Sequence, residues 1–177
     1  MNDDFLDIKV APHHEASTAV KNSVEVMHRV LIDIGWAEPC SKLTRRVEVD
    51  FESSQSPVST VELAIDEVAE CLILCINFAY EATPNVRQQV LRFITRANWA
   101  LVVGNFEMDV NSGELRFRSS LVFGSTALSE TLVQRLIASA MDVVDRHVAE
   151  LMLVLKGGFD ADVAIEFVWL KNTTEVK

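Results

Sequence analysis

Ten consecutive residues, 71–80 (CLILCINFAY), carry no charge and are rich in Leu, Ile and Phe. A run of this length is far below the roughly 18 apolar residues that a membrane-spanning helix needs. It is typical of a strand that is buried on both faces. We therefore expect residues 71–80 to lie in the middle of a sheet, where the other strands and helices must be arranged around them.

Five other segments have strand character. Residues 47–52 alternate Val and Phe with acidic side chains, as in a half-buried strand, and a loop follows at 53–57. The stretch 57–68 is ambiguous: its alternation and β-branched content favour a strand, but its apolar residues also fit helical spacing. Residues 101–110 and 114–123 are predicted to form a hairpin around Asn111-Ser112-Gly113, and 163–169 has strand composition.

Three helices are predicted. The first begins at Ser17 or Thr18 and carries one apolar stripe as far as Gly35. The second begins at Thr83, with Pro84 in its first turn. The third begins at Ser129 and ends at Lys156-Gly157-Gly158. The stripe of the second helix consists of Val86, Val90, Phe93, Ile94 and Ala97.

The element order predicts an α+β fold, an antiparallel sheet with helices on one side. The order is α-β-β-β-α-β-β-α plus a C-terminal strand. At 177 residues, the chain has the size of a single domain, 1–177, with a core at about 17–157 and a C-terminal extension at 158–177.

The charge balance excludes several classes of partner. Lys and Arg number 16 and Asp and Glu 26, giving a net charge of −10. Duplex nucleic acids and anionic membranes both require a cationic surface, so neither is an expected partner. The acidic start, Met1-Asn2-Asp3-Asp4, differs from a secretory signal, and we expect a cytoplasmic location.

The cysteines and histidines do not form a recognised metal or catalytic pattern, so we expect no cofactor, no metal and no disulfide. On a strand, Cys71 and Cys75 would be about 13 Å apart and would be buried thiols; Cys40 is the third cysteine. His13 and His14 are expected in a solvated loop and His28 at the boundary of the first helix. His147 falls within the apolar stripe of the last helix and is expected in a core or an interface.

The hairpin carries its own register signal. Glu107 and Asp109 share one face of the first strand, and Arg116 and Arg118 share one face of the second. Pairing Glu107 with either arginine sets acid against base and apolar against apolar, whereas a slip by one residue destroys both matches. This pattern predicts a ladder of ion pairs, with a polar recognition surface as the alternative.

The segments RANWALVVGNFEMD (96–109) and GELRFRSS (113–120) resemble the YbjN family of bacterial proteins. The resemblance covers about 83–157, and His147 stands where an aromatic residue is expected. The family is similar in fold to type III secretion chaperones, which are small, acidic, dimeric and non-enzymatic. The resemblance therefore implies this fold and a protein-binding role.

These observations favour a non-enzymatic adaptor, regulator or chaperone that binds another protein. The alternative is an enzyme that uses the acid and arginine cluster of the hairpin. The candidate recognition face consists of Asn98, Asn105, Glu107, Asp109, Arg116 and Arg118.

The long last helix favours a homodimer, because its apolar stripe is broad and its final turns would extend beyond the sheet. A monomer in which 159–169 covers these turns is the alternative. The candidate dimer surface consists of His147, Leu151, Met152 and Leu155.

Overall fold

A five-stranded antiparallel sheet forms the centre of the protein, in the order β1-β2-β3-β5-β4. The computed structural model describes residues 17–39, 42–51 and 56–174. The strands are β1 (Arg46–Asp50), β2 (Val58–Asp66), β3 (Cys71–Phe78), β4 (Asn105–Met108) and β5 (Leu115–Val122).

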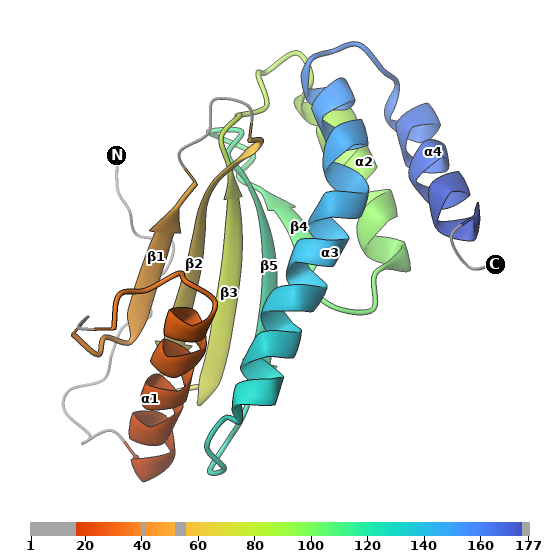
Figure 1. Cartoon of the computed structure of the whole chain (residues 1–177). Helices are drawn as coiled ribbons and strands as arrows, with labels where there is room; N and C mark the ends of the chain where they lie inside the picture. Colours follow the sequence, from red (N-terminus) through yellow and green to blue (C-terminus); the bar gives the residue numbers. More distant parts are fainter. Residues whose placement is uncertain (1–16, 40–41, 52–55, 175–177) are drawn as a thin grey trace.

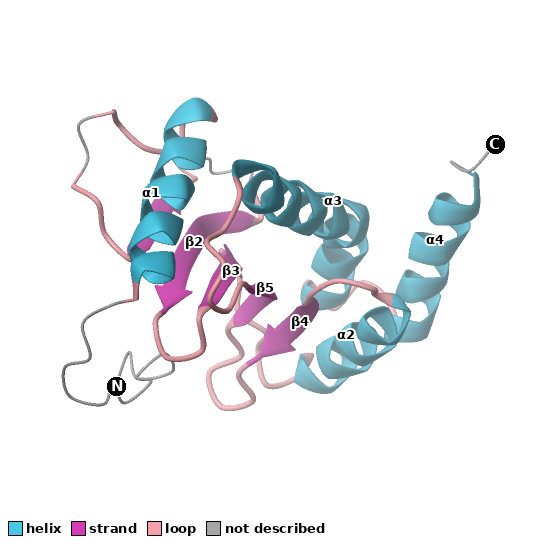
Figure 2. Ribbon diagram, turned by 90° about the horizontal axis from the view of Figure 1, so that it is seen from below, coloured by secondary structure: helices cyan, strands magenta, loops and turns pink. Residues whose placement is uncertain are grey.

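The four described helices are α1 (Thr18–Asp33), α2 (Arg87–Ala100), α3 (Glu130–Leu155) and α4 (Ala161–Thr174). Helices α1 and α3 lie over one face of the sheet, and α2 lies beside β4 (Figures 1 and 2). Helix α4 lies beside α2 and α3 at the end of the molecule farthest from β1. The predicted α+β class and the order of the first eight elements are confirmed.

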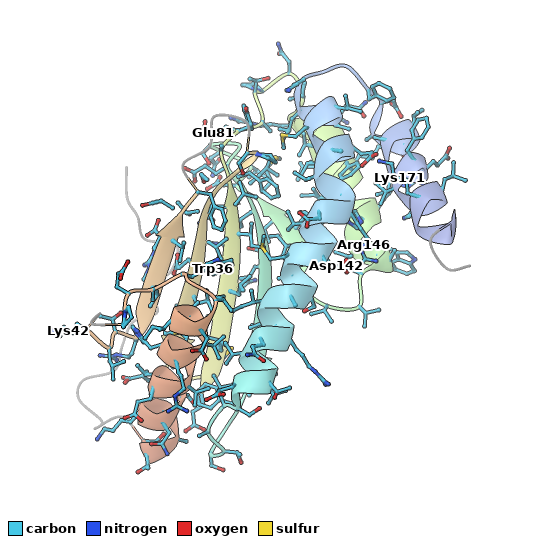
Figure 3. The ribbon with its side chains drawn as sticks, in the orientation of Figure 1. Trp36, Lys42, Glu81, Asp142, Arg146 and Lys171 are labelled. Atoms are coloured by element: carbon cyan, nitrogen blue, oxygen red, sulfur yellow. The ribbon has the colours of Figure 1, made fainter. Side chains whose placement is uncertain are left out.

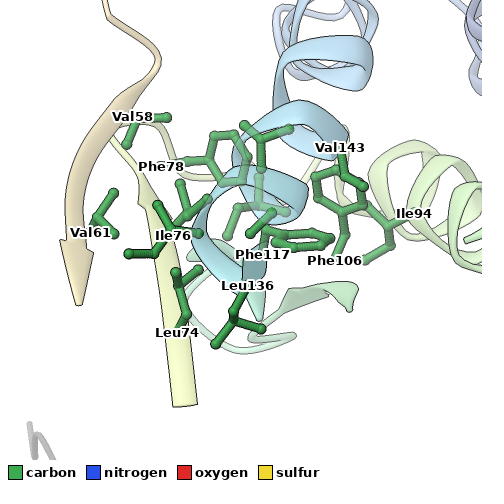
Figure 4. Packing of buried hydrophobic residues seen from close by; sticks show 14 of the residues in the cluster. Val58, Val61, Leu74, Ile76, Phe78, Ile94, Phe106, Phe117, Leu136 and Val143 are labelled. Atoms are coloured by element: carbon green, nitrogen blue, oxygen red, sulfur yellow. The ribbon is translucent and has the colours of Figure 1, made fainter. Parts of the chain in front are cut away.

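Strand β3 lies in the middle of the sheet, as its uncharged sequence predicts, and six of its eight residues are buried. Its helix-facing side chains join those of β2 and β5 against α1, α2 and α3 in one hydrophobic core. Figure 4 shows Leu74 and Ile76 of this strand packed near Phe117 and Leu136. The ambiguous segment 57–68 forms strand β2, as favoured.

Local sequence signals set most of the helix ends. The hydroxyl of Ser17 accepts a hydrogen bond from the Val20 amide, and that of Ser129 accepts one from the Leu132 amide. The predicted start of the second helix is wrong: α2 begins at Arg87, and Val86, its N-terminal flanking residue, makes no side-chain cap. The Thr83 carbonyl accepts hydrogen bonds from the Val86 and Arg87 amides, so residues 83–86 form a preceding turn.

The predicted C-terminal strand is also wrong, because this segment forms helix α4. Ala161, Ala164, Ile165 and Val168 are fully buried, a helical spacing along one face. The opposite face is apolar too, so the composition of 163–169 resembles that of a strand and its period is hidden. Helix α4 covers part of α2 and α3, as the monomeric alternative requires of this segment.

Ion pairs and one cap hold α4 on its neighbours. The Gln89 side-chain oxygen accepts a hydrogen bond from the Ala161 amide at 3.0 Å. Arg96 Nη1 lies 2.6 Å from Asp162 Oδ1, and Arg92 binds the same carboxylate. On the other side Lys171 pairs with Glu150 of α3, and Figure 3 shows Lys171 on the α3-facing side of α4.

Two further expectations need correction. The first hairpin strand begins at Asn105 rather than at 101, because Gly104 turns the chain with φ +69° and a Cβ there would lie 2.3 Å from Phe117 Cζ. His28 is buried rather than at a boundary. Its Nε2 lies 2.8 Å from the Thr44 carbonyl oxygen and 2.9 Å from the Thr44 amide nitrogen, so it ties α1 to the segment that leads into β1.

Candidate functional site

The face of the sheet opposite α1 and α3 is a dipolar polar surface, which we call the outer face. Strand register places four acidic side chains and Arg46 on β1 and β2, uncharged side chains on β3, and two arginines on β5 beside Glu107 of β4. The described members are Arg46, Glu48, Asp50, Thr60, Glu62, Ala64, Asp66, Cys71, Ile73, Cys75, Asn77, Asn105, Glu107, Arg116, Arg118, Ser120 and Val122.

Glu107 is the centre of the basic half. Its Oε2 lies 2.7 Å from Arg116 Nε and 2.6 Å from Arg116 Nη2. Its Oε1 lies 2.8 Å from Arg118 Nε and 2.5 Å from Arg118 Nη2, and accepts a third hydrogen bond from Asn105 Nδ2 at 2.9 Å. The carboxylate thus holds both guanidinium groups by two nitrogens each, in fixed orientations. The predicted hairpin register is confirmed, with Glu107 opposite Arg116 and Phe106 opposite Phe117.

The pKa of Glu107 reflects these contacts. Burial, the largest single influence, raises it, but the hydrogen bonds from Asn105, Arg116 and Arg118 outweigh burial, so the pKa is lower than usual. The carboxylate is therefore ionised at neutral pH. With both oxygens bound by arginines, it is poorly suited to general acid-base chemistry.

The acidic half centres on Glu62, which is only 6% exposed. Burial raises the pKa of Glu62, and the Arg46 guanidinium, whose Nη2 lies 2.9 Å from Oε2, opposes that shift. The other oxygen, Oε1, is buried without a hydrogen-bond partner. Cys75 lies directly opposite Glu62 in the sheet and is itself buried, which raises the pKa of its thiol.

Of the six candidate recognition residues, the structure brings four together: Asn105, Glu107, Arg116 and Arg118. Asn98 instead binds the backbone of Phe106, accepting from its amide at 2.8 Å and donating to its carbonyl at 2.9 Å. Asp109 shapes the hairpin turn by accepting hydrogen bonds from the Asn111 and Ser112 amides. Both are used inside the fold rather than on the outer face.

Sequence reasoning missed the acidic and central parts of the outer face. Glu62, Cys75 and Arg118 occupy one cross-strand row, which continues to Asn105. The alternation of 47–52 and 60–66 was a usable signal for which side chains share a face. The order of the strands was needed to place them beside Arg116 and Arg118.

The candidate dimer surface is only partly accessible. His147 and Leu151 are buried within the chain, and Met152 and Leu155 are half-buried. The His147 ring packs against Phe106, with ring centroids 5.4 Å apart, and its Nδ1 bonds the Val143 carbonyl. Burial lowers the pKa of His147, as expected for a core histidine. The homodimer itself stays a prediction.

Other kinds of site have little support among the described residues. They contain no cluster of three or more His, Cys, Asp or Glu side chains placed to hold a metal. None of the described helices is long and apolar enough to span a membrane. Cys71 and Cys75 are buried free thiols, whereas Cys40, His13 and His14 lie outside the described residues.

Two solved structures with TM-scores above 0.5 support the fold described above. YbjN from E. coli aligns with a TM-score of 0.54 at 11% identity, covering 75% of this chain and 89% of that one. The ExsC-ExsE complex aligns with a TM-score of 0.51 at 16% identity, covering 71% and 90%. The type III secretion chaperone SycH from Yersinia pestis, in complex with a fragment of YscM2, gives 0.46 at 18%, covering 70% and 98%. No curated protein matches the sequence significantly.

The family model of YbjN, described as "Putative bacterial sensory transduction regulator", matches residues 23–169. This range includes all five strands, the first three helices from Ser23 onward and most of α4, and so extends beyond 83–157 on both sides. Since the match spans well over half of the sequence, this chain belongs to the YbjN family.

Proposed function

We propose that this chain is a non-enzymatic adaptor, regulator or chaperone that binds another protein through the outer face of its sheet. The observation that carries the proposal is the arginine pair held by Glu107. An orientation fixed by a carboxylate reduces the side-chain entropy that each guanidinium loses on binding.

The partner segment is expected to carry acidic groups over β5 and basic groups over β1 and β2. Arg118 is 42% exposed along its side chain, and Glu48 and Asp50 are exposed at the opposite edge. Charge arranged this way orients a partner and accelerates its association more than it adds affinity. The ExsC-ExsE complex, one of the similar structures, is a protein bound to another protein, which is the class of role proposed here.

The enzyme alternative requires a carboxylate that can exchange protons near neutral pH. Glu107 is ionised and bound by two arginines. Glu62, whose pKa is raised, is paired with Arg46 and has buried oxygens. Neither carboxylate is therefore well placed to exchange protons with a substrate near neutral pH.

The test is affinity capture from the native bacterium, with the bound protein identified by mass spectrometry. Arg118→Glu should reduce recovery of the specific partner strongly, because it reverses the charge of the exposed guanidinium. Arg135→Glu, an exposed arginine on α3, makes the same charge change away from the sheet and should leave recovery unchanged. Equal recovery of the partner with the wild type, Arg118→Glu and Arg135→Glu would contradict a contact at the outer face.

A further inference from the structure

Glu62 is a buried carboxylate on the outer face, the side of the sheet away from α1 and α3 (Figure 2). Its side chain is only 8% exposed, and just one of its two oxygens has a partner. Oε2 lies 2.9 Å from Arg46 Nη2, whereas Oε1 is buried without a hydrogen bond. Native structures rarely leave a buried polar atom in this state, because the cost is high, above all for a charged group. The unused oxygen therefore points to a donor that a bound molecule supplies.

Arg46 covers this carboxylate through a single exposed contact. It lies opposite Ala64 in the sheet, so its side chain reaches Glu62 diagonally across the two strands. That side chain is 59% exposed, and Glu62 is its one hydrogen-bonding partner among the described residues. An ion pair whose cation is this exposed stabilises a fold only weakly. A cation from outside the chain can therefore displace Arg46 at little cost to the fold.

The surroundings of Glu62 carry more negative charge than the protein itself neutralises. On the outer face of β1 and β2, four carboxylates share the single guanidinium of Arg46; they belong to Glu48, Asp50, Glu62 and Asp66. Glu48 and Asp50 are exposed, and neither has an ion pair within the part of the chain that the structure describes. Charge complementarity therefore selects a cationic group for this place.

We propose that Glu62 binds an arginine side chain of the partner protein, and that Arg46 occupies this place until the partner displaces it. The inference rests on the proposed function, since it names the partner group that contacts the acidic half of the outer face. An arginine suits the site better than a lysine, because a planar guanidinium donates two parallel hydrogen bonds to the two oxygens of one carboxylate. Arg46 binds only Oε2, so the exchange supplies the missing donor to Oε1.

The test uses Nα-acetyl-L-argininamide, a small molecule with one guanidinium, in place of the partner. The carboxyl carbon-13 resonance of Glu62, assigned by comparison with Glu62→Gln, is followed at pH 7.5 as the probe is added. It should shift to saturation, and Arg46→Ala should lower the dissociation constant at least about threefold, because the competing cation is gone. Arg45→Ala is the matched control, since Arg45 is a neighbouring exposed arginine that pairs with Glu67 and its loss makes the same charge change. The affinity of Arg45→Ala should equal that of the wild type.

Two further readouts separate this site from general attraction to an acidic protein. Nα-acetyl-L-lysinamide has the same charge as the arginine probe and should bind Glu62 more weakly. Burial is the main influence that raises the pKa of Glu62, Glu48 also raises it, and Arg46 and Arg116 lower it. Arg46→Ala should therefore raise this pKa, and the arginine probe should lower it again. Glu62→Gln should fold, because burial already disfavours the charged form of this side chain.

A Glu62 resonance that does not saturate, equal affinity for the two probes, or equal tightening by Arg45→Ala and Arg46→Ala would each overturn the proposal. In the capture experiment, Glu62→Gln should reduce recovery of the partner. Full recovery with Glu62→Gln but not with Arg118→Glu would reject the Glu62 contact alone. Full recovery with both variants would reject the outer face as the binding surface.

Discussion

At the scale of single residues, Glu107 connects the local sequence to the proposed site. One carboxylate satisfies two guanidinium groups and one amide, and so holds together two neighbouring strands of the hairpin. Replacing it would leave Arg116 and Arg118 side by side without the charge that now separates them. This residue therefore affects both the stability of the hairpin and the shape of the outer face.

Glu107→Gln should lower the free energy of unfolding by about 1–3 kcal/mol at pH 7, the range for hydrogen bonds to charged groups. The pKa of Glu107 is lowered in the folded state, so its stabilisation is present above about pH 4.3 and is lost as pH falls through the folded-state value. Urea unfolding at pH 7 and at pH 3.5 should show a smaller difference between variant and wild type in acid. Glu114 is an exposed acid in the same hairpin, and Glu114→Gln should leave the free energy of unfolding unchanged at both pH values.

His147 should make the stability of the wild type pH-dependent. Its pKa is lowered mainly by burial, so the unfolded state binds more protons, and stability falls as pH drops below about 6.5. Arg146 opposes protonation and Glu150 favours it, and both remain in a variant at this position. His147→Phe keeps a ring against Phe106 and should lose less stability between pH 7.5 and 5.5 in urea titrations. An equal loss in both proteins would assign this acid sensitivity to other groups.

At the scale of elements, the Asn98 side chain makes the two backbone hydrogen bonds that a further strand beside β4 would make. β4 is an edge strand, and the Asn98 amide pairs with the Phe106 N–H and C=O groups as a neighbouring backbone would. Exposed edges are a common route to unwanted strand pairing. The α2 helix thus closes one edge of the sheet through a single side chain.

Asn98→Ala should destabilise the protein by about 1–3 kcal/mol, because two backbone groups of Phe106 lose their partners. Hydrogen exchange followed by NMR should show faster exchange of the Phe106 amide, with little change at β3. Gln88→Ala, at an exposed position on the same helix, provides the control for helix propensity. Unchanged protection of Phe106 would show that the Asn98 contact contributes little in solution.

The elements that sequence alone could predict are those with a local signal. The uncharged run of β3, the Ser17 and Ser129 caps and the alternating charges at Glu107 and Arg116 each indicated their structure without long-range information. Helix α4 could not be read this way, because its apolar residues surround the helix and leave no period. The burial of His28 depends on Thr44, and that of Glu62 on the order of the strands.

At the scale of the whole molecule, α1, the sheet, α2, α3 and α4 share one hydrophobic core. The core runs from Val20 in α1 to Val168 in α4 without an interruption between them. Trp36 packs edge to face on Phe51 at one end, and Trp169 lies under the Arg96 guanidinium at the other. These tryptophans give reporters at opposite ends of the fold.

We expect the two ends to unfold together, as for a single domain. Variants that retain only Trp36 or only Trp169 should show the same urea midpoint by fluorescence, and both should coincide with the far-UV circular dichroism transition. An earlier transition of the Trp169 reporter would mean that α4 detaches before the rest of the fold.

The position of α4 also affects how the chain folds during its synthesis. The end of α2 at Ala100 precedes the start of α4 at Ala161 by 61 residues. At about 5–20 residues per second, roughly 3–12 s pass before the ribosome has added them. During that interval α4 has not yet been made. The side chains of Gln89, Arg92 and Arg96 on α2 therefore lack the α4 groups that they bind in the finished fold. Until α4 has been made, the side of α2 that it covers in the finished fold is exposed to solvent in the nascent protein.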